Sequence, residues 1–216
     1  MWNWKDIMET CSRYLKPGSG KTEAVEKKKH VEPKEISERK WNNMGKIKVL
    51  VISDTHRNVR KINDVMKREK QVDLVLHMGD LEGHGEYIRQ VTKCPLEAVR
   101  GNCDYDGEFR IDNLIEVGGH MIFMTHGHRY GVDYGLYELE DMARGCGADI
   151  AMYGHTHQPY FEKMEDGFVI LNPGSLGSPR QNPRRPSYMI MEVDTETGVV
   201  KYYQQYLSVP GEGRIF

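Results

Sequence analysis

The central part of the chain alternates short apolar runs with segments in which apolar residues recur at helical spacing. The run IKVLVIS at 47–53 predicts a buried strand, and the spacing over 58–69 predicts an amphipathic helix. The same reasoning predicts a strand at 73–78, a helix near 85–92 and a strand near 96–100. This βαβαβ order is typical of a parallel sheet with helices on its faces.

After the third predicted strand, the pattern changes to paired strands around short turns. Gly118-Gly119 separates DNLIEV from HMIFMT, and a two-residue glycine turn favours an antiparallel hairpin. Further hairpins are predicted around Asp166-Gly167 and Thr197-Gly198, with a helix from about 134 to 144 and a strand at 149–153 before them. Two packed sheets with helices outside would accommodate this order.

Residues 1–45 differ in composition from the rest of the chain. All three tryptophans lie there with ten Lys or Arg and seven Asp or Glu, which leaves 20 of the 30 basic and 25 of the 32 acidic side chains for residues 46–216. We therefore divide the chain into an N-terminal extension, 1–45, and one domain, 46–216. Because Met44 closely precedes the first strand, the extension is interpreted as flexible or as the product of an upstream start site. An amphipathic partner or membrane-surface helix is the alternative.

Length and composition restrict the possible function classes. A chain of 216 residues can form one sizeable core, and its nearly balanced charge gives no argument for nucleic-acid or membrane-surface binding. Four scattered cysteines without a CxxC pair fit reduced thiols, and no apolar stretch approaches the roughly 18 to 20 residues that span a bilayer. We expect a cytoplasmic protein with no membrane or nucleic-acid partner, and the sequence leaves a homo-oligomer open.

Five short polar segments directly follow apolar runs, and each contains side chains that can bind a metal ion. Such segments would lie at a sheet rim, which is where open α/β sheets bind their ligands. Oxygen and nitrogen donors without thiolates suit Mn, Fe, Zn, Ni or Mg, and the mixture alone does not choose among these metals. Two ions need a shared carboxylate, for which Asp80 is the natural candidate. The candidate ligands are Asp54, His56, Asp80, Asn102, His126, His155 and His157.

The segments DTH, GD, GNCD, THGH and GHTH, in this order, resemble the motifs of the calcineurin-like metallophosphoesterase superfamily over about residues 46–207. The chain is most similar to the small single-domain phosphodiesterases of bacteria and archaea, a branch that is also similar to the retromer subunit of eukaryotes. The resemblance implies an α/β fold, namely a four-layer α/β/β/α sandwich of two mixed sheets. It also implies a phosphoric ester hydrolase, a phosphodiesterase for a small or nucleotide-like substrate.

The same resemblance implies two divalent metal ions, with Mn²⁺ favoured and Ni²⁺, Fe²⁺, Zn²⁺ or Mg²⁺ also compatible. A water or hydroxide that bridges the two ions would attack phosphorus in line. One ion would be bound by Asp54, His56, Asp80 and His157, and the other by Asp80, Asn102, His126 and His155. The residues assigned to catalysis are Asp54, Asp80, Asn102 and His126.

Four residues are expected to contact the substrate: Asn102, Cys103, His128 and Arg180. Many members of the superfamily have a histidine at the position of Cys103, where it is thought to protonate the leaving group. A neutral thiol is a poor substitute, which favours a diester whose leaving group needs little protonation. Asp104 is expected to orient this loop. His128 either faces the substrate or has a structural role, and Arg180 lies either near the substrate phosphate or on an ordinary surface turn.

Two other functions are weighed against the phosphodiesterase. A metal-free interaction scaffold like the retromer subunit is disfavoured because all four expected ligand histidines are present. A nuclease of the same superfamily would require a basic groove and the leaving-group histidine. The acidic balance of residues 46–216 and the presence of Cys103 favour a small substrate instead.

Overall fold

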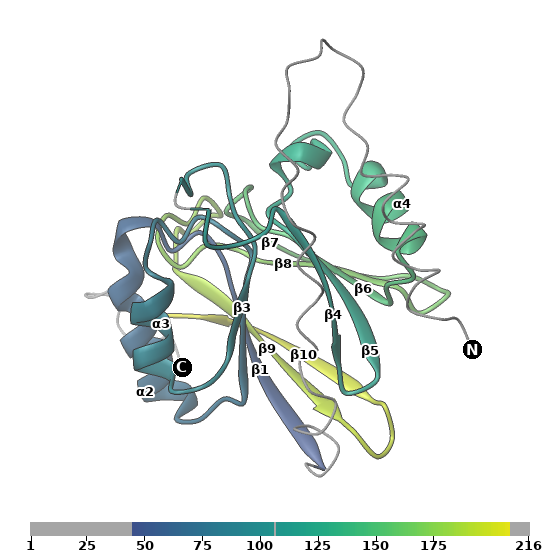
Figure 1. Ribbon diagram of the computed structural model, residues 1–216, viewed down its shortest axis with the longest axis horizontal. Coiled ribbons are helices and arrows are strands. Elements are labelled where there is room, and N and C mark those ends of the chain that lie inside the picture. The colour runs from purple at the N-terminus through teal and green to yellow at the C-terminus, as the bar shows by residue number, and fades with distance from the viewer. Residues whose placement is uncertain (1–44, 106, 208–216) are drawn as a thin grey trace, which may run out of the picture.

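The computed structural model describes residues 45–105 and 107–207, where the chain forms two β-sheets packed face to face with helices on their outer faces (Figure 1). The start-site hypothesis at Met44 and the extension up to residue 44 lie outside the described residues. The layer order of helices, sheet, sheet and helix confirms the predicted four-layer α/β/β/α sandwich.

The first sheet consists of β1 (Lys46–Ile52), β2 (Leu74–His77), β3 (Leu96–Ala98), β9 (Ser187–Asp194) and β10 (Val200–Tyr206). Its strand order is β10-β9-β1-β2-β3. The neighbours β1, β2 and β3 are parallel, whereas β9 is antiparallel to both β1 and β10, so the sheet is mixed. Ile52 lies opposite His77, and His77 lies opposite Ala98. The carboxyl ends of the three parallel strands therefore share one edge.

The second sheet consists of β4 (Asp112–Val117), β5 (His120–Thr125), β6 (Ile150–Met152), β7 (Pro159–Lys163) and β8 (Val169–Pro173). Its strand order is β4-β5-β6-β8-β7, with β5, β6 and β8 parallel and the two outer strands antiparallel to their neighbours. Hairpins β4–β5, β7–β8 and β9–β10 confirm the three turns predicted from glycine.

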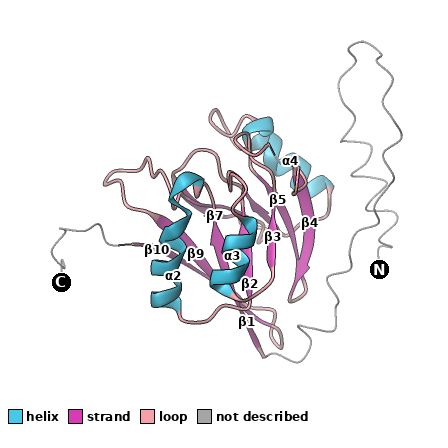
Figure 2. Ribbon diagram, turned by 60° about the vertical axis from the view of Figure 1, so that its left-hand side comes forward, coloured by secondary structure: helices cyan, strands magenta, loops and turns pink. Residues whose placement is uncertain are grey.

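Helices cover the outer face of each sheet. In the first sheet, α2 (Ile62–Glu69) and α3 (Gly85–Thr92) lie side by side over the strands (Figure 2) and bury Ile62, Val65 and Ile88 in a cluster with Leu50 and Ile52. In the second sheet, α4 (Tyr137–Gly145) buries an apolar face against β5, β6 and β8. Two short 3₁₀ helices, η1 (His56–Lys61) and η2 (His128–Tyr130), follow β1 and β5 directly.

Two helices differ from the sequence prediction at their amino-terminal ends. The helix predicted over 58–69 is divided into the end of the 3₁₀ helix η1 and the α-helix α2, and Asn58, within η1, has non-helical angles of φ −96° and ψ 24°. The helix predicted from about 134 begins at Tyr137. The preceding residues instead form a turn, in which Gly131 has φ +57° and accepts a hydrogen bond from the backbone N–H of Tyr134 at 2.8 Å.

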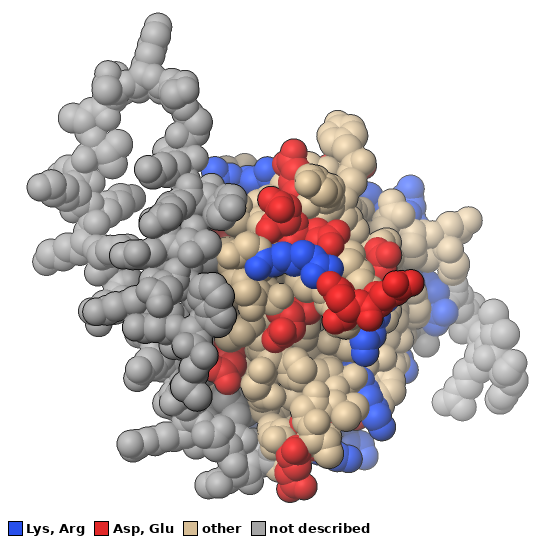
Figure 3. Space-filling model, turned by 90° about the vertical axis from the view of Figure 1, so that its right-hand side faces the viewer, with Lys and Arg blue, Asp and Glu red and all other residues tan. Residues whose placement is uncertain are grey.

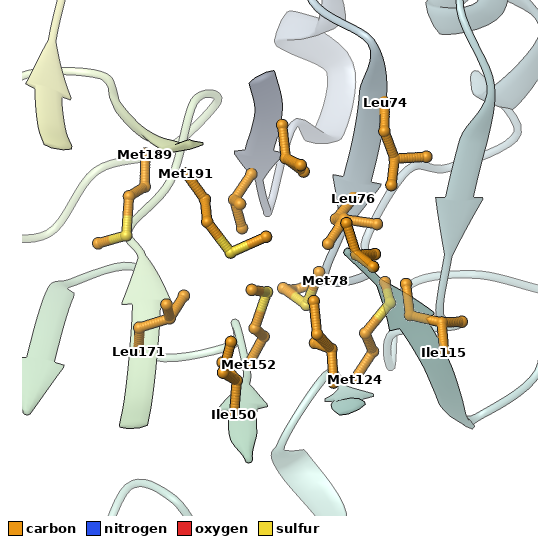
Figure 4. Packing of buried hydrophobic residues seen from close by; sticks show 14 of the residues in the cluster. Leu74, Leu76, Met78, Ile115, Met124, Ile150, Met152, Leu171, Met189 and Met191 are labelled. Atoms are coloured by element: carbon orange, nitrogen blue, oxygen red, sulfur yellow. The ribbon is translucent and has the colours of Figure 1, made fainter. Parts of the chain in front are cut away.

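The core between the two sheets is rich in methionine (Figure 4), with Met78, Met124, Met152, Met189 and Met191 fully or almost fully buried. Methionine is unbranched and adapts to irregular gaps, which suits the contact between two twisted sheets. Three of these side chains belong to strand ends that precede candidate ligands. The packing of the core therefore fixes the positions from which the ligands project.

Within residues 45–105 and 107–207, no helix is long and apolar enough to cross a membrane. Cys94 and Cys103 are not disulfide-bonded, as expected. Cys146 is instead disulfide-bonded, so the expectation of reduced thiols is wrong for this residue.

Candidate metal centre

The backbone has an unusual conformation at most of the candidate ligands. Eight described residues other than glycine have positive φ, and five of them are candidate ligands. The left-handed region costs an L-residue roughly 1–3 kcal/mol, so such residues persist only where the surroundings hold them in place. The chain therefore turns sharply at the ends of β1, β2 and β6 and directs the side chains inward. These ligands are Asp54, His56, Asp80, His155 and His157.

Glycines allow the ligand loops to approach one another closely. A Cβ atom at Gly101 would lie 2.5 Å from the backbone nitrogen and 2.8 Å from Cγ of Asp80. A Cβ atom at Gly154 would lie 2.9 Å from Oδ2 of Asp54. No side chain fits at either position unless the ligand moves, so these glycines are needed for the packing of the centre.

The first group of ligand atoms comes from Asp54, His56, Asp80 and His157, and these atoms all lie within 4.8 Å of one another. Nε2 of His157 is 3.0 Å from Oδ1 of Asp54 and 3.3 Å from Nε2 of His56. Nε2 of His56 is also 3.8 Å from Oδ2 of Asp80. The group is largely buried, and only His56 is partly exposed.

Hydrogen bonds on the far side of each imidazole determine which ring nitrogen faces this group. Nδ1 of His56 donates to Oε1 of Glu82 at 2.8 Å, and Nδ1 of His157 donates to the backbone oxygen of Ser178 at 2.7 Å. Each neutral ring then presents the lone pair of Nε2 to the other. The buried Oδ1 of Asp54 accepts no hydrogen bond of acceptable geometry. Lone pairs and carboxylates facing one another in a buried space fit a cation.

Without a cation, a proton can occupy the same position. Burial lowers the pKa of His157, but the carboxylate of Asp54 outweighs this effect and leaves the pKa raised. Burial likewise raises the pKa of Asp54, but His157 and the nearby His126 leave it lowered. Each group thus favours the charged form of the other, and a bound cation would compete with a proton on His157.

A second group of acceptor atoms lies on the other side of Asp80. Nε2 of His126 is 3.0 Å from Oδ1 of Asn102 and 3.5 Å from Oδ2 of Asp80, while Nδ1 of His155 is 3.1 Å from the same Asn102 oxygen. Nδ1 of His126 donates to the backbone oxygen of Met78 at 2.7 Å, and Nε2 of His155 donates to Oδ2 of Asp133 at 2.9 Å. Both rings therefore present a lone pair to the amide oxygen.

The carboxylate of Asp80 lies between the two groups. Its Oδ2 is 3.8 Å from His56 and 3.5 Å from His126, whereas its Oδ1 accepts the backbone N–H of Cys103 at 2.8 Å. Asp104 fixes this loop, because its Oδ2 accepts the backbone N–H groups of Asp80 and Gly101, each at 2.8 Å. The orienting role expected for Asp104 is confirmed. The fold thus brings the side chains of all seven candidate ligands together.

The candidate substrate-binding residues surround the more open side of the centre, where Asn102 is exposed. The Cys103 thiol has a pKa raised to about 11 by burial and by the negative charge of Asp80, so it is neutral at physiological pH. The His128 ring lies 5.4 Å from that of His126, and burial together with His126 lowers its pKa to about 4. Its buried Nδ1 has no hydrogen-bond partner.

Arg180 is exposed on the loop after β8, where its backbone N–H donates to the carbonyl oxygen of His157 at 3.1 Å. Its positive charge slightly opposes the raised pKa of His157, an effect smaller than that of Asp54.

Two carboxylates that support ligand histidines were not singled out from the sequence. Glu82 holds His56, and Asp133 holds His155. Glu82 lies two residues after Asp80, and this nearness was the available signal for it. Asp133 lies in a loop without periodicity, and only the fold brings it to His155. His77 is buried beneath the centre within 3.1 Å of the Thr55 hydroxyl, and burial lowers its pKa to about 3.

Comparisons with known proteins agree with this geometry. The chain matches the calcineurin-like phosphoesterase superfamily domain over residues 47–196. It is 35% identical over 158 residues, 73% of this chain and 90% of the relative, to the probable metallophosphoesterase YsnB of Bacillus subtilis. It is 29% identical over 147 residues to the phosphodiesterase MJ0936 of Methanocaldococcus jannaschii, with 59% of this chain and 83% of the relative covered.

Among solved structures, the Vps29 double mutant of Entamoeba histolytica superimposes with a TM-score of 0.60 at 23% identity. The match covers 75% of this chain and all of the other, and at this identity it shows the fold alone. The match over residues 47–196 and the 35% identity to YsnB show the family as well as the fold. This chain belongs to the calcineurin-like phosphoesterase superfamily.

Proposed function

We propose that the protein is a phosphodiesterase that depends on two divalent metal ions and acts on a small or nucleotide-like substrate. The proposal rests on two groups of acceptor atoms, one on each side of Asp80. The acceptors of each group face one another, and a bound cation would satisfy them. Membership of the superfamily and the name of the M. jannaschii relative support the same reaction class.

The donor set fits two ions of the kind favoured by oxygen and nitrogen ligands, with Mn²⁺ preferred and Ni²⁺, Fe²⁺, Zn²⁺ or Mg²⁺ compatible. When bound, such ions supply an activated water and neutralise negative charge on the phosphoryl oxygens. The first ion would be held by Asp54, His56, Asp80 and His157, and the second by Asp80, Asn102, His126 and His155.

The protein's own contribution is to orient these ligands and to receive the substrate. Glu82 and Asp133 hold the ligand histidines in one tautomer, and this kind of support typically raises metal affinity 10–100-fold. The exposed amide of Asn102 faces the open side, where its N–H groups can donate to a phosphoryl oxygen. Arg180 provides a positive charge on the same rim.

The absence of a ready proton donor favours a diester over a monoester. Cys103 has a pKa of about 11, and the neutral His128 has a pKa of about 4, so neither is matched to proton donation near pH 7. A substrate with an acidic leaving group does not need such a donor.

The test combines metal analysis with hydrolysis of two generic aryl esters. The metal-free protein should be inactive, and it should bind two Mn²⁺ ions per chain. The reloaded protein should then hydrolyse bis(p-nitrophenyl) phosphate faster than p-nitrophenyl phosphate. Asp80→Asn should lose both metal binding and turnover, whereas the matched control Asp64→Asn, on the exposed side of α2, should retain both. Turnover by Asp80→Asn at the wild-type rate would refute the shared-ligand role.

The alternative is an interaction scaffold, because this chain has the same fold as Vps29. The complete ligand set, most of it buried, favours the enzyme. A protein with neither stoichiometric metal nor turnover in the assay above would favour the scaffold.

A nuclease is disfavoured by charge. Residues 46–216 hold 20 basic and 25 acidic side chains. On the face seen in Figure 3, acidic side chains gather with basic ones among them, and no broad basic surface is seen. Binding to nucleic acid depends mainly on such a surface.

A further inference from the structure

A groove of about 560 Å³ lies beside the metal centre, and most of its lining comes from η1, the short helix that begins at the ligand His56. We propose that this groove binds a second phosphate group of the substrate. The substrate class is then a small phosphodiester that also carries a phosphate monoester. This inference rests on the proposed phosphodiesterase activity and narrows its substrate.

The groove contains positive charge that the protein does not neutralise. Arg57, Arg60 and Lys61 are three cations within five consecutive residues. Nε of Arg57 is 3.8 Å from Oε2 of Glu82, whereas neither Arg60 nor Lys61 has a carboxylate within 4.0 Å among residues 45–105 and 107–207. Partial burial lowers the pKa of Lys61. A bound anion would offset the cost of holding this cation in the groove.

Neutral donors complete the lining. The hydroxyl oxygen of Tyr87 accepts a hydrogen bond from Nδ2 of Asn63 at 2.7 Å, which leaves the hydroxyl proton to donate. Nδ1 of His84 donates to the backbone oxygen of Leu81 at 2.7 Å, so this imidazole is held in a fixed orientation at the rim. Guanidinium, ammonium and hydroxyl donors around one hollow suit a phosphate, which has several acceptor oxygens and a negative charge.

Gly177, in the loop after β8, connects η1 to the metal centre through hydrogen bonds. The backbone oxygen of Gly177 accepts hydrogen bonds from Nδ2 of Asn58 at 3.0 Å and from Nζ of Lys61 at 3.5 Å. Its backbone N–H donates to the carbonyl oxygen of Asp54 at 2.9 Å. The groove therefore adjoins the metal centre: Arg57 directly follows the ligand His56 in the chain, and the loop of Gly177 contacts both η1 and Asp54.

The test compares the p-nitrophenyl ester of thymidine 5′-phosphate with and without a 3′-phosphate, using the Mn²⁺-loaded protein. In the wild type, kcat/KM should be at least about tenfold higher for the ester with the 3′-phosphate. The double variant Arg60→Gln/Lys61→Gln should abolish this preference and bring the ratio of the two kcat/KM values to about 1, since it removes two charge-assisted contacts. Lys67→Gln, on the exposed surface of α2, is the matched control and should keep the preference.

Equal kcat/KM values for the two esters in the wild type, or the same preference in the double variant, would overturn the groove assignment while leaving the phosphodiesterase intact. If the protein hydrolyses neither these esters nor bis(p-nitrophenyl) phosphate, the proposed function fails. Calorimetric binding of thymidine 3′,5′-bisphosphate then tests the groove alone. Weaker binding by Arg60→Gln/Lys61→Gln would support the groove, and equal binding would overturn it.

Discussion

The substitution Gly101→Ala should disable the metal centre without removing any ligand. The added Cβ atom would lie 2.5 Å from the backbone nitrogen of Asp80 and 2.8 Å from its Cγ, whereas ordinary contact begins at 3.4 Å. Either the loop of Gly101 or that of Asp80 must therefore move by about 1 Å, and a displacement of this size can cost about 100-fold in activity. Because Asp80 adjoins both groups of ligand atoms, binding of both ions should weaken together.

The assay measures Mn²⁺ affinity by calorimetry, kcat/KM on bis(p-nitrophenyl) phosphate and the free energy of unfolding in urea. Overpacking at Gly101 should also lower the free energy of unfolding by about 1–3 kcal/mol. Gly135→Ala is the matched control, because its Cβ atom would meet nothing within 4 Å and its φ is not positive. A Gly101→Ala protein with kcat/KM within threefold of the wild type would refute the claim that this close approach positions Asp80.

Three further predictions concern the residues around the ligands. Glu82→Gln and Asp133→Asn should each weaken a different one of the two bound ions by about 10–100-fold, as resolved by metal titration. Mn²⁺ affinity should fall as pH decreases through the raised pKa of His157 and level off above it, with proton release measured by calorimetry in buffers of different ionisation enthalpy. Tyr188→Phe, which removes a 2.6 Å hydrogen bond to Glu69, should lower the free energy of unfolding by about 1 kcal/mol in urea.

The sequence predicts that the candidate ligands converge because each follows an apolar run, and parallel strands end at a common edge. Asp54, Asp80 and Asn102 follow three strands of the first sheet, while His126 and His155 follow two strands of the second. The sequence does not predict how the two edges meet. That depends on the packing of the sheets, which apolar periodicity indicates only in general terms.

The parts that escaped prediction depend on contacts between loops that are distant in the chain. Asp133 and His155 are 22 residues apart, and Asn58 and Gly177 are 119 apart. The cations of η1 would be interpreted from sequence as an ordinary solvated helix turn. Only the folded structure shows that they line a groove and that Lys61 is hydrogen-bonded to Gly177, whose backbone also contacts Asp54.

Each proposed ion would be held by ligands from both sheets. His157 from the second sheet completes the group that contains Asp54 and His56, and Asn102 from the first sheet lies between His126 and His155. Neither group can form unless the methionine-rich core brings the two sheets into register. By linkage, an ion that binds only the folded chain stabilises this packing, by about 2.7 kcal/mol at a concentration 100 times its dissociation constant. Such binding would offset part of the backbone strain at the five ligands with positive φ. The strain energy of the ligand loops and the free energy of metal binding are therefore coupled through the interface between the two sheets.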